Sequence, residues 1–265
     1  MINKYFSIFN ISWQNMLIYR LNFVLWRFRT VLQFLLVYFV WWTVFQTQTS
    51  VFGYTEASIL TYVLISALTR AIVLSSRIMD IGGHISEGGI VNFLVKPQGI
   101  IGFYFARDLA DKLLNISFVI FELAGIYFLL KPEIIIQTNI NILLQFILSI
   151  VLAMVLYFAL SFAFGLLAFW LENIWGIYFL FFMSIEALGG GLFPIDILPE
   201  RFANMILLTP FPYLLYFPAK VYTGTLGYDQ LMSGFTILSI WTVISWVLMK
   251  RVLNAGLRMY TAVGH

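Results

Sequence analysis

Two glutamates interrupt apolar stretches of the sequence in which a charged group is costly. Glu122 lies within residues 109–130 and Glu186 within residues 175–193. At the centre of a bilayer a carboxylate costs about 2.5–3.5 kcal/mol, so it normally faces a cavity, a partner or the protein interior. Both residues are therefore pathway or interface candidates that would contact a substrate or a proton. The structural alternative is a protonated or hydrogen-bonded side chain, and the sequence shows no clear basic partner for either.

A second acidic pair, Asp108 and Asp111, resembles a paired-carboxylate metal motif. We expect both residues in the first turn of a helix that begins near residue 109, where the helix dipole favours negative charge by a few tenths to about 1 kcal/mol. Arg107 and Lys112 are adjacent. We favour this structural interpretation over a metal site.

Residues 77–107 form a polar, glycine-rich segment between two apolar stretches. Glycine pairs at 82–83 and 88–89 allow sharp turns and close backbone approach. Ile90, Phe93 and Leu94 recur at helical spacing, and Pro97 ends the pattern. A compact helix with one apolar face between two spans suits a docking surface for a partner protein. The alternative is a linker that packs on its own spans.

Residues 194–229 contain most of the prolines, at positions 194, 199, 210, 212 and 218. The stretches 202–208 and 213–222 are nevertheless too apolar for an ordinary aqueous loop. The pattern predicts two short helices, broken at Pro210–Pro212, that enter the outer, extracellular leaflet of a membrane and return. Irregular backbone persists at that depth only when it is buried in protein or lines a wet cavity. We therefore expect this region, with Phe193, Pro194 and Pro210, to cap a pathway; a seventh span is the alternative, against which the prolines count.

The elements that must position these residues are apolar stretches of membrane-spanning length. About 20 mostly apolar residues are needed to cross a bilayer. Six stretches qualify, at 31–52, 57–76, 109–130, 140–170, 175–193 and 231–249. The sequence thus predicts an all-α integral membrane protein with six transmembrane helices in a single domain, residues 1–265.

The first 29 residues differ from these spans. Asn3, Ser7, Asn10 and Gln14 recur at helical spacing, and another face carries the apolar set Tyr5, Phe9, Trp13 and Met16 or Leu17. This amphipathic pattern is typical of a helix that lies in the plane of the membrane interface. The alternative is a helix packed on a neighbouring element.

Composition supports the membrane class and excludes others. Hydrophobic residues make up 62% and charged residues 10% of the 265-residue chain, whereas soluble domains carry about 25% charged residues. The chain has no cysteine and two histidines, His84 and His265, so thiolate and multi-histidine metal sites are not expected. No basic run supports nucleic-acid binding. The segment before residue 30 lacks the pattern of a cleaved signal peptide.

The basic residues predict an orientation. If the N-terminus is cytosolic and the chain crosses six times, Lys131, Arg201 and Lys220 lie outside, Arg70 lies near the inner end of the second span, and the remaining Lys and Arg residues lie inside. Because Lys and Arg are enriched in cytoplasmic loops, both termini are expected in the cytosol.

Covalent chemistry is not expected of this chain. It contains no phosphate-binding G-x-x-x-x-G-K-[ST] loop, no H-E-x-x-H motif and no G-x-S-x-G nucleophile elbow.

Three sets of residues together resemble a membrane subunit of an ATP-binding-cassette (ABC) exporter of the type-two superfamily, which handles drugs, lipids and polysaccharides. Ser86-Glu87-Gly88-Gly89-Ile90 with Leu94-Val95-Lys96-Pro97 resembles that family's "S-G, then L-L-K-P" signature. Gly191-Leu192-Phe193-Pro194, Leu198-Pro199, Pro210-Phe211 and Tyr216-Phe217-Pro218 resemble its outer motif, and Arg20-Leu21-Asn22-Phe23 resembles the start of its first span. The resemblance covers nearly the whole chain, as a small six-span permease separate from its ATPase.

The resemblance implies a working unit of two permeases and two ATPases in a bacterial-type inner membrane, the second permease being a related chain or a second copy. ATP and Mg²⁺ would bind to the ATPases, and this chain would hold no cofactor. Residues 80–96 would be the coupling helix, residues 1–29 the connecting helix and residues 197–222 the re-entrant outer helices. The implied coupling residues are Asp80, His84, Ile85, Ser86, Glu87, Gly88, Gly89, Ile90, Phe93 and Lys96.

Two other functions remain open. A secondary transporter or channel would work without nucleotide and would depend on Glu122 or Glu186. A membrane enzyme acting on lipid would use Asp108 and Asp111 to bind metal.

Overall fold

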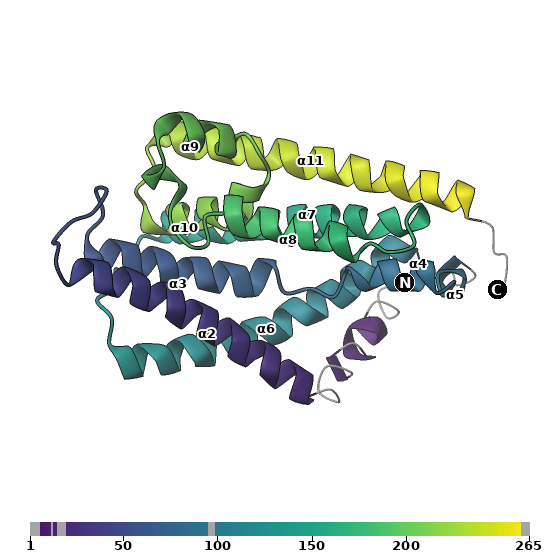
Figure 1. The fold of residues 1–265 in the computed structure, drawn as a ribbon, viewed down its shortest axis with the longest axis horizontal. Coiled ribbons are helices and arrows are strands. Elements are labelled where there is room, and N and C mark those ends of the chain that lie inside the picture. The colour runs from purple at the N-terminus through teal and green to yellow at the C-terminus, as the bar shows by residue number, and fades with distance from the viewer. Residues whose placement is uncertain (1–5, 12, 15–19, 95–98, 261–265) are drawn as a thin grey trace.

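The computed structural model describes residues 6–11, 13–14, 20–94 and 99–260. Within these ranges the chain is helical and has no strand, apart from an isolated bridge between Val51 and Tyr54. Figure 1 shows elongated helices that run between two ends of the molecule. We call these the α4 end, which holds α4 (Asp80–Ser86) and α5 (Val91–Leu94), and the α9 end, which holds α9 (Glu200–Leu207) and α10 (Tyr216–Thr223).

Five helices in the described part of the chain are long and apolar enough to cross a membrane. They are α2 (Arg20–Phe45), α3 (Glu56–Val73), α6 (Ile100–Leu130), α7 (Ile140–Gly165) and α11 (Tyr228–Met259). The remaining elements are α8 (Trp175–Leu188) and the single-turn helices η1 (Leu166–Phe169), η2 (Ile195–Ile197) and η3 (Phe211–Leu214). The all-helical membrane class predicted from composition is confirmed.

The predicted fifth span is the element that departs most from expectation. Its helix, α8, has 14 residues and ends at Leu188 rather than at residue 193. At about 1.5 Å per residue it is roughly 21 Å long, shorter than the ~30 Å hydrocarbon core. Three consecutive glycines, 189–191, follow it. The number of membrane crossings therefore stays a prediction.

Other predicted boundaries were displaced as well. Helix α6 begins at Ile100 rather than at residue 109, because the apolar residues before Arg107 continue the helical pattern and Gly99 provides the extended N-cap. Consequently the polar connection after α3 is shorter than the predicted segment 77–107. Helix α2 ends at Phe45, before the predicted limit at residue 52.

Helix α7 is the centre of the packing, since it contacts α3, α8, α10 and α11. One buried apolar cluster joins α2, α3, α7 and α10, and a second joins α4, the start of α6, η1 and the last turns of α11. Large apolar side chains on the outer faces of α2, α6, α7 and α11 remain exposed. Such continuous apolar surface is expected to face lipid rather than water.

The two short helices predicted around Pro210 are present as α9 and α10, with Pro210 preceding η3 between them. Each has eight residues, about 12 Å, which is too short for the alternative of a seventh span. Helix α10 is buried against α3 and α7. Its position in the membrane stays a prediction.

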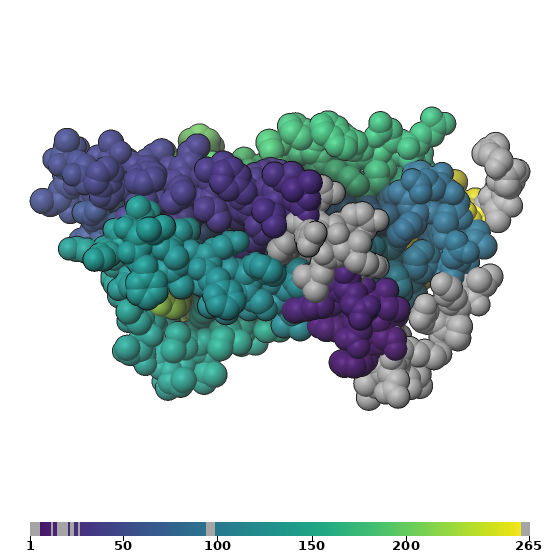
Figure 2. All heavy atoms as spheres, turned by 90° about the horizontal axis from the view of Figure 1, so that it is seen from below, coloured from purple at the N-terminus to yellow at the C-terminus, as the bar shows by residue number. Residues whose placement is uncertain are grey.

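Part of the predicted amphipathic segment is helical, at residues 6–11 and 13–14. Figure 2 shows this helical segment on the side of the α4 end, while α2 and α6 lie next to each other toward the opposite end of the same face. Ile8 is buried, whereas Phe6 and Ile11 are exposed. Asn3, Tyr5, Met16 and Leu17 lie outside the described residues, and the connecting role of residues 1–29 stays a prediction.

Candidate functional site

The α4–α5 segment contains most of the residues expected to couple to a partner. Its inner side is fixed to the chain's own helices, because Ile81, Ile85 and Ile90 are buried at the α4 end. Ile85 and Ile90 were both coupling candidates, and their side chains point into the bundle. Any partner would therefore contact the opposite side of this segment.

Glycine at position 82 allows α4 to lie directly on its neighbours. A Cβ atom there would collide with the side chains of Ile174 and Tyr178. The Tyr178 hydroxyl also donates a 2.6 Å hydrogen bond to the carbonyl of Met79, the residue before α4. Helix α4 is thus held against α8 and against the loop that precedes α8.

Polar and aromatic contacts fasten the same segment to α6. Asp80 forms an ion pair with Arg107, and a ring nitrogen of His84 is hydrogen-bonded to the hydroxyl of Tyr104. Phe93 packs edge-on against Phe103, with ring centroids 4.8 Å apart. These contacts hold α4 and α5 as one body with the first turns of α6.

The outward side of the segment is exposed at Asp80, Ser86, Glu87 and Gly88. Gly88 has a φ of +75°, which L side chains rarely adopt, and it lets the chain turn from α4 toward α5. Gly89, the next residue, is half-buried. Lys96 lies outside the described residues.

Glu122 has a basic partner that the sequence interpretation missed. Arg27 of α2 donates to both carboxylate oxygens of Glu122 and also, at 3.0 Å, to the side chain of Asn115. The Arg27 side chain is only 6% exposed. The partner was not evident in the sequence, because it lies 95 residues earlier on a different helix. A hydrogen bond to a neighbouring helix is the structural alternative named for Glu122 from the sequence.

Glu186 is paired in the same way. Both guanidinium NH₂ groups of Arg70 on α3 reach its carboxylate, one of them at 3.0 Å, and the side-chain amide of Gln33 lies 3.5 Å from it. Gly191 makes room for this guanidinium, because a Cβ atom at that position would collide with it. Glu186 is thus hydrogen-bonded to a neighbouring helix, which is the structural alternative named for it from the sequence.

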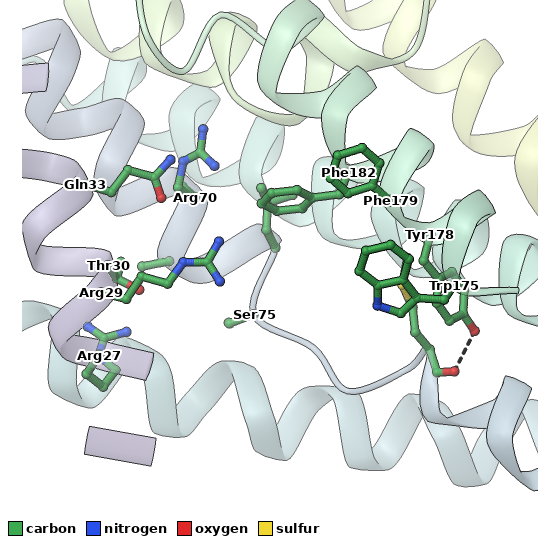
Figure 3. Close-up of a pocket in the computed structure, with 13 residues that line it drawn as sticks. Arg27, Arg29, Thr30, Gln33, Arg70, Ser75, Trp175, Tyr178, Phe179 and Phe182 are labelled. Atoms are coloured by element: carbon green, nitrogen blue, oxygen red, sulfur yellow. Dashed lines mark hydrogen bonds between the residues drawn. The ribbon is translucent and has the colours of Figure 1, made fainter. Parts of the chain in front are cut away.

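The two arginines line a pocket of about 320 Å³ between α2, α3 and α8, in the half of the bundle nearest α4. Figure 3 shows Gln33, Arg27, Arg29 and Arg70 on one side of it and the aromatic residues of α8 on the other. The lining residues are Arg27, Arg29, Thr30, Gln33, Arg70, Ala71, Leu74, Ser75, Met79, Trp175, Tyr178, Phe179 and Phe182.

Asp108 and Asp111 do not lie in the first turn of a helix. They lie more than two turns inside α6, so the helix-dipole explanation was wrong. Asp108 pairs with Lys112 at 2.9 Å, and Asp111 accepts from the backbone and guanidinium of Arg77 at 2.6–3.2 Å. Among the described residues no group of three or more possible metal-binding side chains occurs.

The α9 end holds the remaining candidates. Phe193 is half-buried against the main apolar cluster, and Pro194 and Pro210 are buried before η2 and η3. Phe193 and Pro194 belong to the connection from α8 to α9, and Pro210 to the connection from α9 to α10. They belong to the connections that, with η2, α9, η3 and α10, close the α9 end (the cap), and they do not line the pocket.

A buried lysine ties this cap together. Lys220 of α10 donates to Asp196 at 2.9 Å and to the Tyr54 hydroxyl at 3.1 Å. Burial, followed by the nearby Asp196 carboxylate, raises the pKa of the Tyr54 phenol. Tyr54 therefore remains a neutral donor to Asp196, at 2.8 Å.

Sequence reasoning missed Arg27, Arg29 and Arg70 as functional residues. One signal was available, because a charge inside an apolar helix needs a partner at similar depth. Arg70 and Glu186 each interrupt an apolar stretch, and pairing them would have been the simplest way to satisfy both.

Comparison with known proteins places the chain in a family. The family model described as "ABC-2 family transporter protein" matches residues 31–264. A comparison with curated proteins found no match. The matched region includes α3, the α4–α5 segment, the paired glutamates, and both short helices of the α9 end. The chain is a multi-pass membrane protein that belongs to the ABC-2 transporter family and serves as the permease component of an ABC transporter.

Proposed function

We propose that this permease forms half of the translocation pathway of an ATP-driven exporter and that its α4–α5 segment is the coupling helix. The observation that supports this most strongly is the shape of the segment. A short helix between two long apolar helices is anchored on one side to α6, η1 and α8, and is exposed on the other. A docking surface that transmits force needs both properties.

In this proposal Asp80, Ser86, Glu87 and Gly88 contact the ATPase, with Lys96 beyond the described part of the segment. Ile85, Ile90 and Phe93 would support the surface from within, and His84 would orient it through Tyr104. Two ATPase subunits would bind ATP and Mg²⁺. A second permease, related to this chain or identical with it, would complete the pathway.

The anchoring contacts suggest how motion would pass from the ATPases to the spans. Closure of the ATPases would displace α4, and the hydrogen bond from Tyr178 to Met79 would carry the displacement into α8. The Asp80–Arg107 pair would carry it into α6. Because packed helices shift as units rather than deform continuously, such a displacement would rock the spans and alternate access to the pathway.

The basic residues support an orientation with the α4 end in the cytosol. Arg77, Arg107, Lys250 and Arg258 lie in the parts of their helices or loops nearest to that end. Positive residues favour the cytoplasmic side. In a bacterial-type inner membrane this would place both termini in the cytosol and the cap formed by η2, α9, η3 and α10 on the outer side.

The test of this proposal is capture of an ATPase. The tagged permease is expressed with the P-loop ATPase encoded beside it, and the ATPase recovered with the permease is measured. Glu87→Arg should lower recovery at least tenfold, because reversing a charge in a complementary surface costs several kcal/mol. Glu133→Arg, an exposed substitution after α6 toward the α9 end, should leave recovery unchanged. Equal recovery with both variants would refute the coupling role of this surface.

The nucleotide-independent alternative is less well supported. Glu122 and Glu186 would have to act as a substrate or proton site, yet each is already engaged by an arginine. Reconstitution of the permease alone, with and without a proton gradient, distinguishes the two proposals. Transport by the lone chain would favour a secondary transporter.

A further inference from the structure

The pocket between α2, α3 and α8 has two unlike walls. The wall formed by α8 is aromatic and carries Trp175, Phe179 and Phe182, with Tyr178 beside them. The facing wall carries Arg27, Arg29 and Arg70, and none of the described residues that line the cavity is acidic. A ligand that fills this space must therefore present an apolar surface to one side and a polar group to the other.

The charges of the three arginines are not equally available. Glu122 neutralises Arg27 and Glu186 neutralises Arg70, both from outside the lining. Arg29 forms no ion pair with any residue that the structure describes, and its side chain is exposed. Figure 3 shows its guanidinium extending from α2 into the space in front of α8. The pocket thus has one uncompensated positive charge, at Arg29.

An unpaired guanidinium next to an apolar wall is suited to a lipid phosphate. The planar fork of arginine binds phosphate oxygens through charge-assisted hydrogen bonds, which are stronger than neutral ones. Pocket walls that combine aromatic surface with a few placed polar groups are typical of small-molecule sites. Trp175 is 70% and Phe179 48% exposed, which leaves part of each ring available to an acyl chain.

We propose that this pocket binds an anionic phospholipid-like amphiphile, with its phosphate on Arg29 and its apolar chain along α8, and that such amphiphiles are the substrate class of the exporter. The claim that the amphiphile is transported rests on the proposed function. Binding of the amphiphile to the pocket does not depend on the ATPase. The pocket lies in the half of the bundle assigned to the cytosolic side, so the amphiphile would enter from the inner leaflet.

The test uses Trp175 as a contact reporter. The full-length permease with its ATPase is placed in nanodiscs that contain either brominated phosphatidylglycerol, which is anionic, or brominated phosphatidylcholine, which has no net charge. Bromine quenches a tryptophan that it touches, and the difference between the wild type and Trp175→Phe isolates the contribution of Trp175. We expect that quenching of Trp175 requires roughly tenfold less phosphatidylglycerol than phosphatidylcholine, as one charge-assisted contact would give.

Variants decide whether Arg29 is responsible. Arg29→Gln should abolish the preference for phosphatidylglycerol, and Arg29→Lys should retain part of it. Arg251→Gln, which removes an exposed arginine of α11 outside the pocket, should retain all of it. Excess inorganic phosphate should not displace the lipid, since it lacks the apolar chain; displacement would assign the site to free phosphate instead and overturn the proposal.

Failure of this proposal and failure of the proposed function give different results. Equal quenching by the two lipids, or an unchanged preference in Arg29→Gln, would overturn the lipid site even when the ATPase is still captured. Loss of ATPase capture with a retained lipid preference would leave the binding site standing and remove only its role in export.

Discussion

Two of the regions in which charged side chains are buried among the helices lie around Lys112 and around Arg70. Lys112 and Asp108 are 1% and 2% exposed, and the lysine also donates to the carbonyl groups of Val73 and Ser75. Arg70 and Glu186 are each 14% exposed, and Arg70 lines an open pocket in which the neighbouring Arg29 forms no ion pair with any described residue. The first region is closed and electrically balanced, while the second is open and carries excess positive charge.

This difference separates structural charges from charges that can bind a ligand. Both regions contain buried ion pairs, within α6 in the first and between α3 and α8 in the second. An ion pair in an apolar bundle therefore does not by itself indicate function. A buried pair is weak as a source of stability, because desolvation offsets most of the attraction, but breaking it leaves a costly unpaired charge. Binding capacity comes instead from a cavity and a charge that the protein does not neutralise.

The largest effect is expected from breaking the closed region. Lys112→Met leaves Asp108 buried without its cation and should lower the free energy of unfolding by about 3–5 kcal/mol. The measurement is thermal or denaturant unfolding in detergent. Adding Asp108→Leu should recover part of the loss, because removal of both partners is much less costly than removal of one. If Lys112→Met unfolded with the same free energy as the wild type, the charges around Lys112 would not be structural in the sense drawn above.

A smaller effect on stability, and an opposite effect on binding, is expected in the open region. Glu186→Gln releases Arg70 beside the pocket, where water can reach it, so the loss of stability should be about 1–3 kcal/mol. The second free guanidinium should strengthen the quenching of Trp175 by brominated phosphatidylglycerol. Weaker quenching in a folded Glu186→Gln protein would show that the carboxylate itself takes part in binding.

The smallest effect is expected from an exposed pair. Asp80 is 51% exposed where it meets Arg107, and exposed pairs contribute about 0–1 kcal/mol. Asp80→Asn should therefore leave the unfolding midpoint nearly unchanged. It should still reduce ATPase capture if Asp80 belongs to the coupling surface. A loss of several kcal/mol would mean that this pair belongs with the closed region.

Local patterns predicted the features that depend on neighbouring residues. The prolines around Pro210 predicted two short helices, and α9 and α10 are those helices. The glycines and the apolar spacing at Ile90 and Phe93 predicted a compact segment between two spans. Each of these features is set by turn chemistry and helical periodicity, which act over a few residues.

The contacts of the glutamates could not be predicted in the same way. Arg27 and Glu122 are 95 residues apart, and Arg70 and Glu186 are 116 residues apart. Their pairing depends on how α2, α3, α6 and α8 are arranged, and periodicity says nothing of that arrangement. The error over Asp108 and Asp111 was different, since it followed from placing the start of α6 too late.

Tyr178 is shared by the pocket and the anchor of α4. Its ring lines the cavity, and its hydroxyl holds the carbonyl of Met79. Under the proposed function, a molecule in the cavity that displaces this ring would alter the position of α4, so binding in the cavity and attachment of the ATPase would be linked equilibria. Linkage of this kind is reciprocal: the factor by which the bound molecule changes the affinity for the ATPase equals the factor by which the ATPase changes the affinity for that molecule.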